Sequence, residues 1–207
     1  MQITNQKYSE ILRLNKELGQ TLTSNLYNIK VLSNSTVNMI KEILEYNLRF
    51  EGINANIDIG NYDNIVQDSQ MSKNYDTIII FWDLFNIAEG VYHRVELFDF
   101  NDIEELASKV EYEIDIVFDN LGDESLVIFN EFSSLPFSNF QIDDYNYSKL
   151  CRRLNRYIIE KSPSNFRLVN IDKIISNIGF KKSFDMRYFY SSKSIYSADF
   201  FKYYSNF

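Results

Sequence analysis

The chain is poor in cysteine, histidine, proline and glycine, and each shortage argues against a class of protein. Its 207 residues include one cysteine, Cys151, and one histidine, His93. A single cysteine cannot form an intrachain disulfide, which suits a reducing compartment. With so few nitrogen and sulfur ligands, we expect neither a zinc site nor any other metal site. Only two prolines and six glycines occur, which argues against long flexible linkers.

Positive charge and long apolar runs are also scarce. The chain has 21 Lys and Arg against 29 Asp and Glu, a net charge of −8. Proteins that bind nucleic acids or anionic membranes concentrate positive charge instead. No apolar run approaches the roughly 20 residues needed to cross a bilayer. Residues 1–20 also lack the apolar segment of a signal peptide. We therefore expect a cytoplasmic protein that binds neither nucleic acid nor membrane.

What the chain does contain is enough apolar material for one large domain. The hydrophobic fraction is 45% and the aromatic fraction 16%, which can fill a sizeable core. Residues 7–18 place apolar side chains near helical spacing, and Gly19 could end that helix. We predict an added N-terminal helix and linker over residues 1–27, followed by a single α/β domain over residues 28–207.

Strand and helix signals alternate along the rest of the chain. The strongest strand signal, DTIIIFW at 76–82, is apolar on both faces, as in a central parallel strand. The other predicted strands cover residues 28–32, 53–59, 125–129 and 166–169. The predicted helices cover 37–48, a short stretch near 65, 101–119, 147–160, 172–177 and 197–204. Residues 83–98 are predicted to be a loop with short helices, and loops are predicted at 130–144 and 185–194. This alternation predicts a three-layer, flavodoxin-like, doubly wound parallel sheet of five strands.

Such sheets bind ligands outside the carboxyl ends of their strands. The segments that reach that edge are 33–36, 60–63, 82–86 and 130–131. The first of them, Ser33-Asn34-Ser35-Thr36, lies between a strand end and a helix start. It could bind a phosphate or carboxylate, or Thr36 could simply cap the helix; the sequence leaves both interpretations open.

An ordered set of segments resembles the FkbH-type proteins. The segments are VLSNSTV at 31–37, EGINANIDIGNYDNIVQD at 51–68, Phe129-Asn130 with Leu135-Pro136, Asp185-Met186-Arg187-Tyr188, and Ser194-Ile195-Tyr196-Ser197. The resemblance spans roughly residues 28–205, and it is the order of the motifs that makes it specific. It implies an SGNH-hydrolase-like fold, the first domain of those proteins.

The resemblance also implies partners. FkbH-type proteins usually continue into a haloacid-dehalogenase-like (HAD-like) domain, which is linked to loading a phosphoglycerate-derived glyceryl unit onto a carrier protein. Its Asp-x-Asp-x-Thr signature is not found here, because Asp76-Thr77 opens a strand instead of closing one. The chain therefore resembles the first domain alone, with a HAD-like domain or an acyl-carrier protein as its expected partner. No cofactor is implied, and phosphatase chemistry is not assigned to these residues.

The resemblance to SGNH hydrolases places individual catalytic positions on this chain. Ser35 aligns with the nucleophile, Gly60 with the glycine that donates to the oxyanion, and Asp185 with the late aspartate. The family's base would be a histidine three residues later, where this chain has Tyr188. Tyrosine has a pKa near 10 and is a poor base at neutral pH.

The remaining site positions are substitutes for missing family residues. The Gly-x-Asn-Asp pattern is absent after the third strand, so Asn86 or Asn130 would have to replace its asparagine. His93 could swing toward Ser35 and act as the base, or it is an ordinary loop histidine.

Asn34 and Asp83 complete the expected ligand-binding set at this edge. Because the histidine is missing, we expect a fold that has lost its catalytic triad and serves as a recognition or scaffolding module. The alternative is an active esterase or acyltransferase that uses Ser35 with an unusual base.

Overall fold

The computed structural model describes residues 6–87, 90–122, 126–137 and 146–206 of the chain. Its strands are β1 Tyr27–Ser33, β2 Ala55–Ile59, β3 Thr77–Phe81, β4 Val127–Asn130 and β5 Phe166–Val169. Its α-helices are α1 Tyr8–Thr21, α2 Asn38–Phe50, α3 Ile65–Gln70, α4 Leu84–Ile87, α5 Val91–Arg94, α6 Phe100–Leu121, α7 Asn146–Lys161, α8 Ile171–Ile178, α9 Phe180–Ser183, α10 Met186–Ser192 and α11 Ala198–Tyr204. Two 3₁₀ helices, η2 Val95–Leu97 and η3 Leu135–Phe137, complete the described elements.

The strands form one parallel sheet in the order β2-β1-β3-β4-β5. The chain runs outward from β1 to β2, returns to β3, and then continues outward through β4 to β5. Adjacent strands β1 and β3 therefore lead into connections that leave in opposite directions, which creates a topological switch point between them. The predicted flavodoxin-like and SGNH-hydrolase-like fold class is confirmed.

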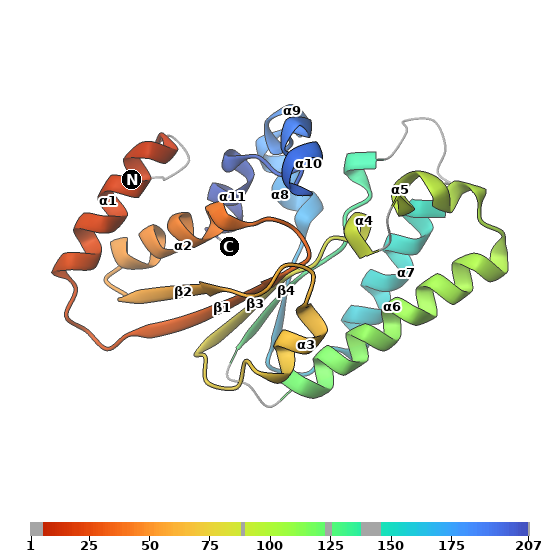
Figure 1. Cartoon of the computed structure of the whole chain (residues 1–207), viewed down its shortest axis with the longest axis horizontal. Coiled ribbons are helices and arrows are strands. Elements are labelled where there is room, and N and C mark those ends of the chain that lie inside the picture. Colours follow the sequence, from red (N-terminus) through yellow and green to blue (C-terminus); the bar gives the residue numbers. More distant parts are fainter. Residues whose placement is uncertain (1–5, 88–89, 123–125, 138–145, 207) are drawn as a thin grey trace.

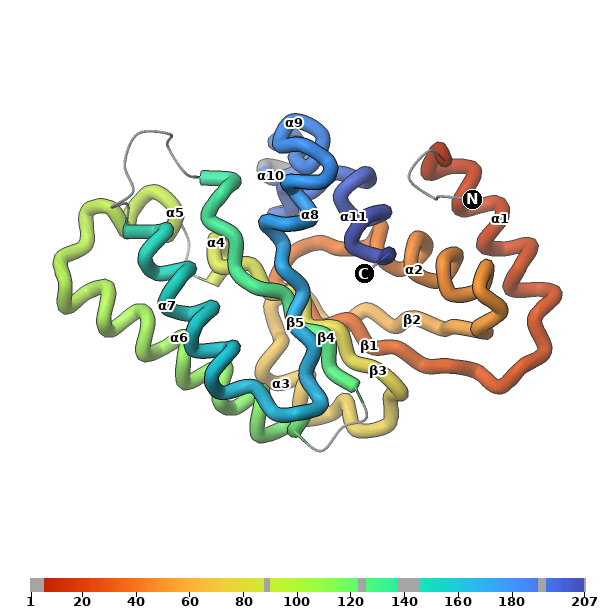
Figure 2. Tube along the Cα trace, turned by 180° about the vertical axis from the view of Figure 1, so that it is seen from behind, coloured from red at the N-terminus to blue at the C-terminus, as the bar shows by residue number. Residues whose placement is uncertain are grey.

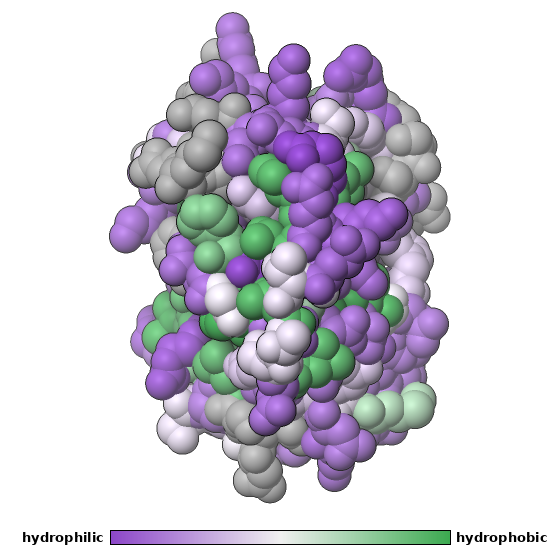
Figure 3. Space-filling view, turned by 90° about the vertical axis from the view of Figure 1, so that its left-hand side faces the viewer, coloured by the Kyte–Doolittle hydropathy of each residue, from purple (hydrophilic) through white to green (hydrophobic). Residues whose placement is uncertain are grey.

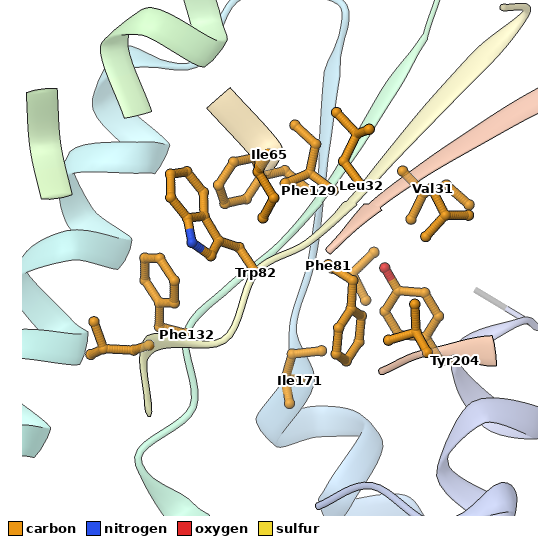
Figure 4. Close-up of a cluster of buried hydrophobic side chains, with 14 of the residues drawn as sticks. Val31, Leu32, Ile65, Phe81, Trp82, Phe129, Phe132, Ile171 and Tyr204 are labelled. Carbon is orange, nitrogen blue, oxygen red and sulfur yellow. The ribbon is translucent and has the colours of Figure 1, made fainter. Parts of the chain in front are cut away.

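The centre of the sheet is β3, in which every residue is buried. Its apolar sequence fits this position because helices cover both faces of the sheet. Figure 4 shows Phe81 lying on the side of Tyr204, and the next residue, Trp82, on the side of Phe132. The rings of Phe81 and Tyr204 meet edge to face with centroids 5.3 Å apart. These alternating aromatic side chains tie the carboxyl end of β3 to both helical layers.

The helices form two layers around the sheet (Figure 1). Helices α2, α8 and α11 pack together on one face, while α3, α6 and α7 pack together on the other. Figure 2 shows the second group from behind, with α6 and α7 side by side. Helix α6 begins with a capping box between Asp99 and Asp102, which satisfies backbone N–H groups at its N-terminus.

The predicted N-terminal helix is α1, and it packs against α2 on the side away from the sheet. Ile11 is fully buried in this contact. The Asn15 side chain donates a hydrogen bond to Glu45 at 3.0 Å and accepts one from Arg49 at 2.7 Å. Arg49 also donates to the carbonyl of Ala55 at 2.8 Å. This polar network joins α1, α2 and β2.

The surface at the α1 end of the molecule mixes apolar and hydrophilic side chains (Figure 3). Large apolar residues are partly exposed in the described part of the chain near this end, among them Leu12, Leu26, Phe50 and Ile53. Hydrophilic side chains lie between the apolar ones in this view. Single exposed apolar residues are normal on soluble surfaces.

Two local predictions are wrong. Residues 185–194 are not a loop, because α10 occupies Met186–Ser192 and Asp185 caps it. Thr36 does not cap a helix either: α2 begins at Asn38 after Val37, without a side-chain cap. The chain bends at residues 34 and 35 after β1 and then passes Thr36 and Val37 before the helix begins. Residue 125, the predicted start of the fourth strand, and residues 138–144 of the predicted loop lie outside the described residues.

None of the helices in the described ranges is long and apolar enough to span a bilayer. Among the same residues, His, Cys, Asp and Glu side chains form no group of three or more that could hold a metal ion.

Candidate functional site

Ser35 and Asp83 meet at the switch point between β1 and β3. The Ser35 hydroxyl donates a short hydrogen bond to the Asp83 carboxylate. The same hydroxyl accepts a hydrogen bond from Asn86 Nδ2 at 2.9 Å. Ser35 is only 3% exposed. Its hydroxyl therefore uses both its donor and an acceptor position inside the protein.

Asp83 is a buried carboxyl group that is held by hydroxyl donors. In addition to Ser35, the hydroxyl of Tyr196 donates to Asp83 at 3.2 Å. Burial raises the pKa of Asp83 to about 7, although the hydrogen bonds from Ser35 and Tyr196 act in the opposite direction. Burial, followed by the nearby Asp83 charge, holds the pKa of Tyr196 well above its usual value. Tyr196 therefore acts as a donor to Asp83.

Two asparagine side chains continue the sheet beyond the end of β3. Asn34 accepts from the Asp83 amide and donates to the Asp83 carbonyl, both at 2.8 Å. Asn130 accepts from the Trp82 amide at 2.6 Å and donates to the Trp82 carbonyl at 3.0 Å. Asn34 follows β1 and Asn130 ends β4, the two neighbours of β3 in the sheet. Each side-chain amide thus replaces a peptide group of the adjacent strand.

The expected oxyanion donors are already bonded within the protein. The Ser35 amide donates to Ser33 Oγ at 2.9 Å, and the Gly60 amide donates to the Val31 carbonyl at 2.7 Å. Asn86 Nδ2 also donates to the Asn34 carbonyl at 3.0 Å and the Lys193 carbonyl at 2.8 Å.

An oxyanion hole needs donors directed at the reacting oxygen. The donors of Ser35, Gly60, Asn86 and Asn130 would each have to release a partner first.

A cavity of about 600 Å³ opens beside this network, with Asn86 in its wall. Tyr92, His93 and Lys193 line it, together with Asp63, whose pKa is raised by burial. The Tyr92 ring stacks on Phe137 at a centroid distance of 4.2 Å. Although His93 lies on this wall, the hydrogen bonds made by the Ser35 hydroxyl go to Asp83 and Asn86. The wall of this cavity therefore presents aromatic, acidic and basic groups that a ligand could contact.

A second, smaller cavity of about 260 Å³ brings Thr36 and Tyr188 together. Ser194 and Tyr196 also line this cavity. Thr36 and Tyr188, which come from distant parts of the sequence and were both expected at the site, thus line the same cavity. The segment from Lys193 to Tyr196 separates the two cavities, since Lys193 faces the larger one and Ser194 the smaller one.

Asp185 forms a salt bridge and hydrogen bonds with Arg187. Its carboxylate accepts from the Arg187 amide at 3.1 Å and from the Arg187 guanidinium at 2.9 Å and 2.5 Å. These bonds lower the pKa of Asp185. The Asp185 amide donates to the Ile195 carbonyl at 2.8 Å, one residue before Tyr196. The segment that follows Asp185 thus reaches the site, whereas the Asp185 carboxylate itself caps α10.

The sequence indicates no individual role for Lys193 or Tyr196, and it includes Ser33 only as part of the polar tetrad 33–36. Tyr196 lies within the Ser194–Ser197 motif that carries part of the family resemblance, but nothing in that motif indicates a bond to Asp83. Ser33 is the last residue of β1, where its hydroxyl accepts from the Ser35 amide and donates to the Ser35 carbonyl at 2.9 Å. Only the folded geometry brings these groups together.

Comparisons with known proteins identify relatives of this fold. No family model and no curated protein sequence matches the chain. The structure of the N-terminal part of BF1531 from Bacteroides fragilis, which contains a phosphatase domain and was solved with Mg, matches 97% of this chain and 54% of that one, with a TM-score of 0.75 and 15% identity. The salicylyl-acyltransferase SsfX3, from a tetracycline biosynthetic pathway, matches 89% of this chain and 54% of that one, with a TM-score of 0.50 and 10% identity. The chain thus spans about half the length of each, and the likeness establishes the fold.

Proposed function

We propose that this domain is a recognition module that keeps an SGNH-hydrolase-like fold without its hydrolytic chemistry. The observation that carries the proposal is the state of Ser35: its hydroxyl is bonded to Asp83 and Asn86, and the residue is 3% exposed. A serine nucleophile must reach the substrate and transfer its proton to a base. Here the serine joins two loops of the sheet edge.

The arrangement of the other expected catalytic groups supports the same conclusion. The Ser35 and Gly60 amides are bonded to protein acceptors, and the residue at the position of the family's histidine is Tyr188, on α10. Asp185 accepts its bonds from Arg187. Recruiting all of these groups for catalysis would require several buried hydrogen bonds to break together.

The cavity of about 600 Å³ is the place where recognition would occur. Its volume lies within the range of roughly 300–1,000 Å³ found for small-molecule sites. We assign to it an acyl or glyceryl-type group, offered free or on the arm of a carrier protein, that is presented to a HAD-like domain. The FkbH resemblance motivates this assignment. The phosphatase domain in the BF1531 structure is consistent with such an arrangement.

The absence of hydrolysis is tested with p-nitrophenyl acetate and p-nitrophenyl butyrate. We expect the purified protein to release p-nitrophenol no faster than its Ser35→Ala variant. Turnover by the unmodified chain that Ser35→Ala abolishes would overturn the proposal.

Recognition is tested by NMR titration with pantetheine and with glycerate. We expect saturable shifts at residues around the larger cavity, and Tyr92→Ala should weaken binding about tenfold, a loss of about 1.4 kcal/mol. The matched control is Tyr112→Ala, which removes an exposed tyrosine from α6 and should leave the affinity unchanged. Equal weakening by both variants, or no saturation with either probe, would contradict the assignment.

One observation favours a second function, acyl transfer by Ser35 with Asp83 as its base. The carboxylate accepts a hydrogen bond directly from the Ser35 hydroxyl, and its pKa of about 7 suits a general base near neutral pH. In that case Asp83→Asn would abolish ester turnover as completely as Ser35→Ala. The rate of the unmodified protein would rise with pH through about 7.

A further inference from the structure

The smaller cavity lies at the first turn of α2. Its wall contains Thr36, Asn38 and Met39, and α2 is a 13-residue helix that begins at Asn38. The first turn of a helix has backbone N–H groups without partners inside the helix, and it carries partial positive charge. Here no side chain caps the helix, and no acidic residue lies in its first turn. The positive end of α2 is therefore not neutralised by its own sequence.

An unpartnered hydroxyl lies in the same wall. Ser194 is 4% exposed, and its Oγ makes no hydrogen bond to any residue that the structure describes. A buried hydroxyl without a partner costs free energy unless something else supplies the missing bond. Because Ser194 lines this cavity, an occupant of the cavity can supply that bond. Ser194 comes from a segment far along the chain, so this observation is independent of the α2 terminus.

The other lining groups shape the cavity. Tyr188, Tyr196 and Phe201 form aromatic parts of its wall, which restrict its occupant to a small molecule or a small terminal group. The Tyr196 hydroxyl is bonded to Asp83, and burial raises the pKa of that carboxyl to about 7. The negative charge behind Tyr196 is therefore reduced at and below neutral pH.

We propose that this cavity binds a small oxyanion, a carboxylate or phosphate group, held between the first-turn amides of α2 and the hydroxyl of Ser194. Helix N-termini provide such sites through N–H groups directed at the anion. Thr36 is placed to add its hydroxyl from the loop before the helix. The site is separate from the larger cavity, so it does not depend on the function proposed above.

The proposal is tested on the full chain by NMR titration with inorganic phosphate and, separately, with acetate at constant ionic strength. We expect saturable shifts at the amides of Asn38 and Met39. Saturation with phosphate alone would assign a phosphate group, and saturation with acetate alone a carboxylate. The absence of saturable shifts at these amides with both anions would overturn the proposal.

Substitutions test the two elements of the site. Ser194→Ala should weaken binding about tenfold, because a hydrogen bond to a charged group is worth about 1.5 kcal/mol or more. Its control is Ser205→Ala, which removes another buried, unpartnered serine hydroxyl beyond the end of α11. Equal affinities of Ser194→Ala and the unmodified chain would overturn the role of Ser194.

A second variant keeps the test valid if Ser194→Ala folds poorly. Asn38→Asp places a carboxylate at the exposed first position of α2, where it neutralises the helix terminus and repels an incoming anion. We expect this variant to lose binding while its melting temperature is unchanged or higher. Asn38→Gln is the uncharged control and should still bind. Undiminished binding by Asn38→Asp would contradict the site.

Discussion

Asn34 and Asn130 hold consecutive residues at the end of β3 from opposite sides, Asn34 at Asp83 and Asn130 at Trp82. Each asparagine both donates to and accepts from the backbone, as a neighbouring strand would. Both are buried, with exposures of 0% for Asn34 and 1% for Asn130. The position of Asp83, and with it the Ser35 contact, therefore depends on these two side-chain amides.

Replacing Asn130 with aspartate should weaken the fold. The substitution removes the donor to the Trp82 carbonyl and places carboxylate charge in a buried site. We expect the free energy of unfolding to fall by about 3 kcal/mol, as measured by urea denaturation. Asn101→Asp on the exposed start of α6 is the control and should change it by less than about 0.5 kcal/mol. Similar effects of the two substitutions would show that Asn130 does not brace β3.

Ser35→Ala should destabilise the protein, because the serine joins Asp83 to Asn86. The substitution removes the hydroxyl bonded to both side chains in a buried region. We expect a loss of about 1–3 kcal/mol in urea unfolding, compared with a negligible loss for Ser176→Ala on the exposed side of α8. An unchanged urea midpoint of unfolding for Ser35→Ala would indicate that the serine has a chemical role and not a structural one.

Asp83 should make stability fall as pH rises. Burial raises its pKa from 3.8 to about 7, so between those values the folded state holds a proton that the unfolded chain has lost. Stability is therefore highest below the unfolded pKa and declines until pH passes about 7. The full decline corresponds to about 4 kcal/mol at about 1.36 kcal/mol per pKa unit.

The variant Asp83→Asn isolates this effect from other carboxyl groups. Its urea unfolding should lack the decline, so the stability of the unmodified chain relative to Asp83→Asn should shrink steadily between about pH 4 and pH 7. A parallel pH dependence of the two proteins would show that Asp83 does not hold a proton in the folded state.

The strands and the polar edge could be predicted because their signals are local. The apolar run before Trp82 indicates a central strand, and a polar tetrad directly after β1 must lie at the carboxyl edge of a parallel sheet. Strands and helices that alternate along a chain tend to form a doubly wound sheet, so the overall architecture could also be predicted.

The partners at the site could not be predicted, because they depend on distant loops. The bond between Ser35 and Asp83 joins residues 48 positions apart, and that between Asp83 and Tyr196 joins residues 113 apart. Helix α10 was missed for a related reason. Its serine and tyrosine residues have modest helix propensity, and its N-terminus depends on Asp185 as a cap. The family pattern correctly placed Ser35 at the edge but contained no information on which residue would bond to it.

The position of α1 outside α2 has a consequence for how the molecule opens. Because α1 packs mainly on α2, on the side away from the sheet, it can detach while the strands remain paired and covered by α2. Amide hydrogens of α1 should therefore exchange with solvent through a local opening, earlier than those of β1 and β3. Hydrogen exchange measured residue by residue checks this, and equal protection of α1 and β3 would contradict it. In that sequence of events, the polar edge that carries Ser35 and Asp83 would remain assembled after the first layer of the protein has loosened.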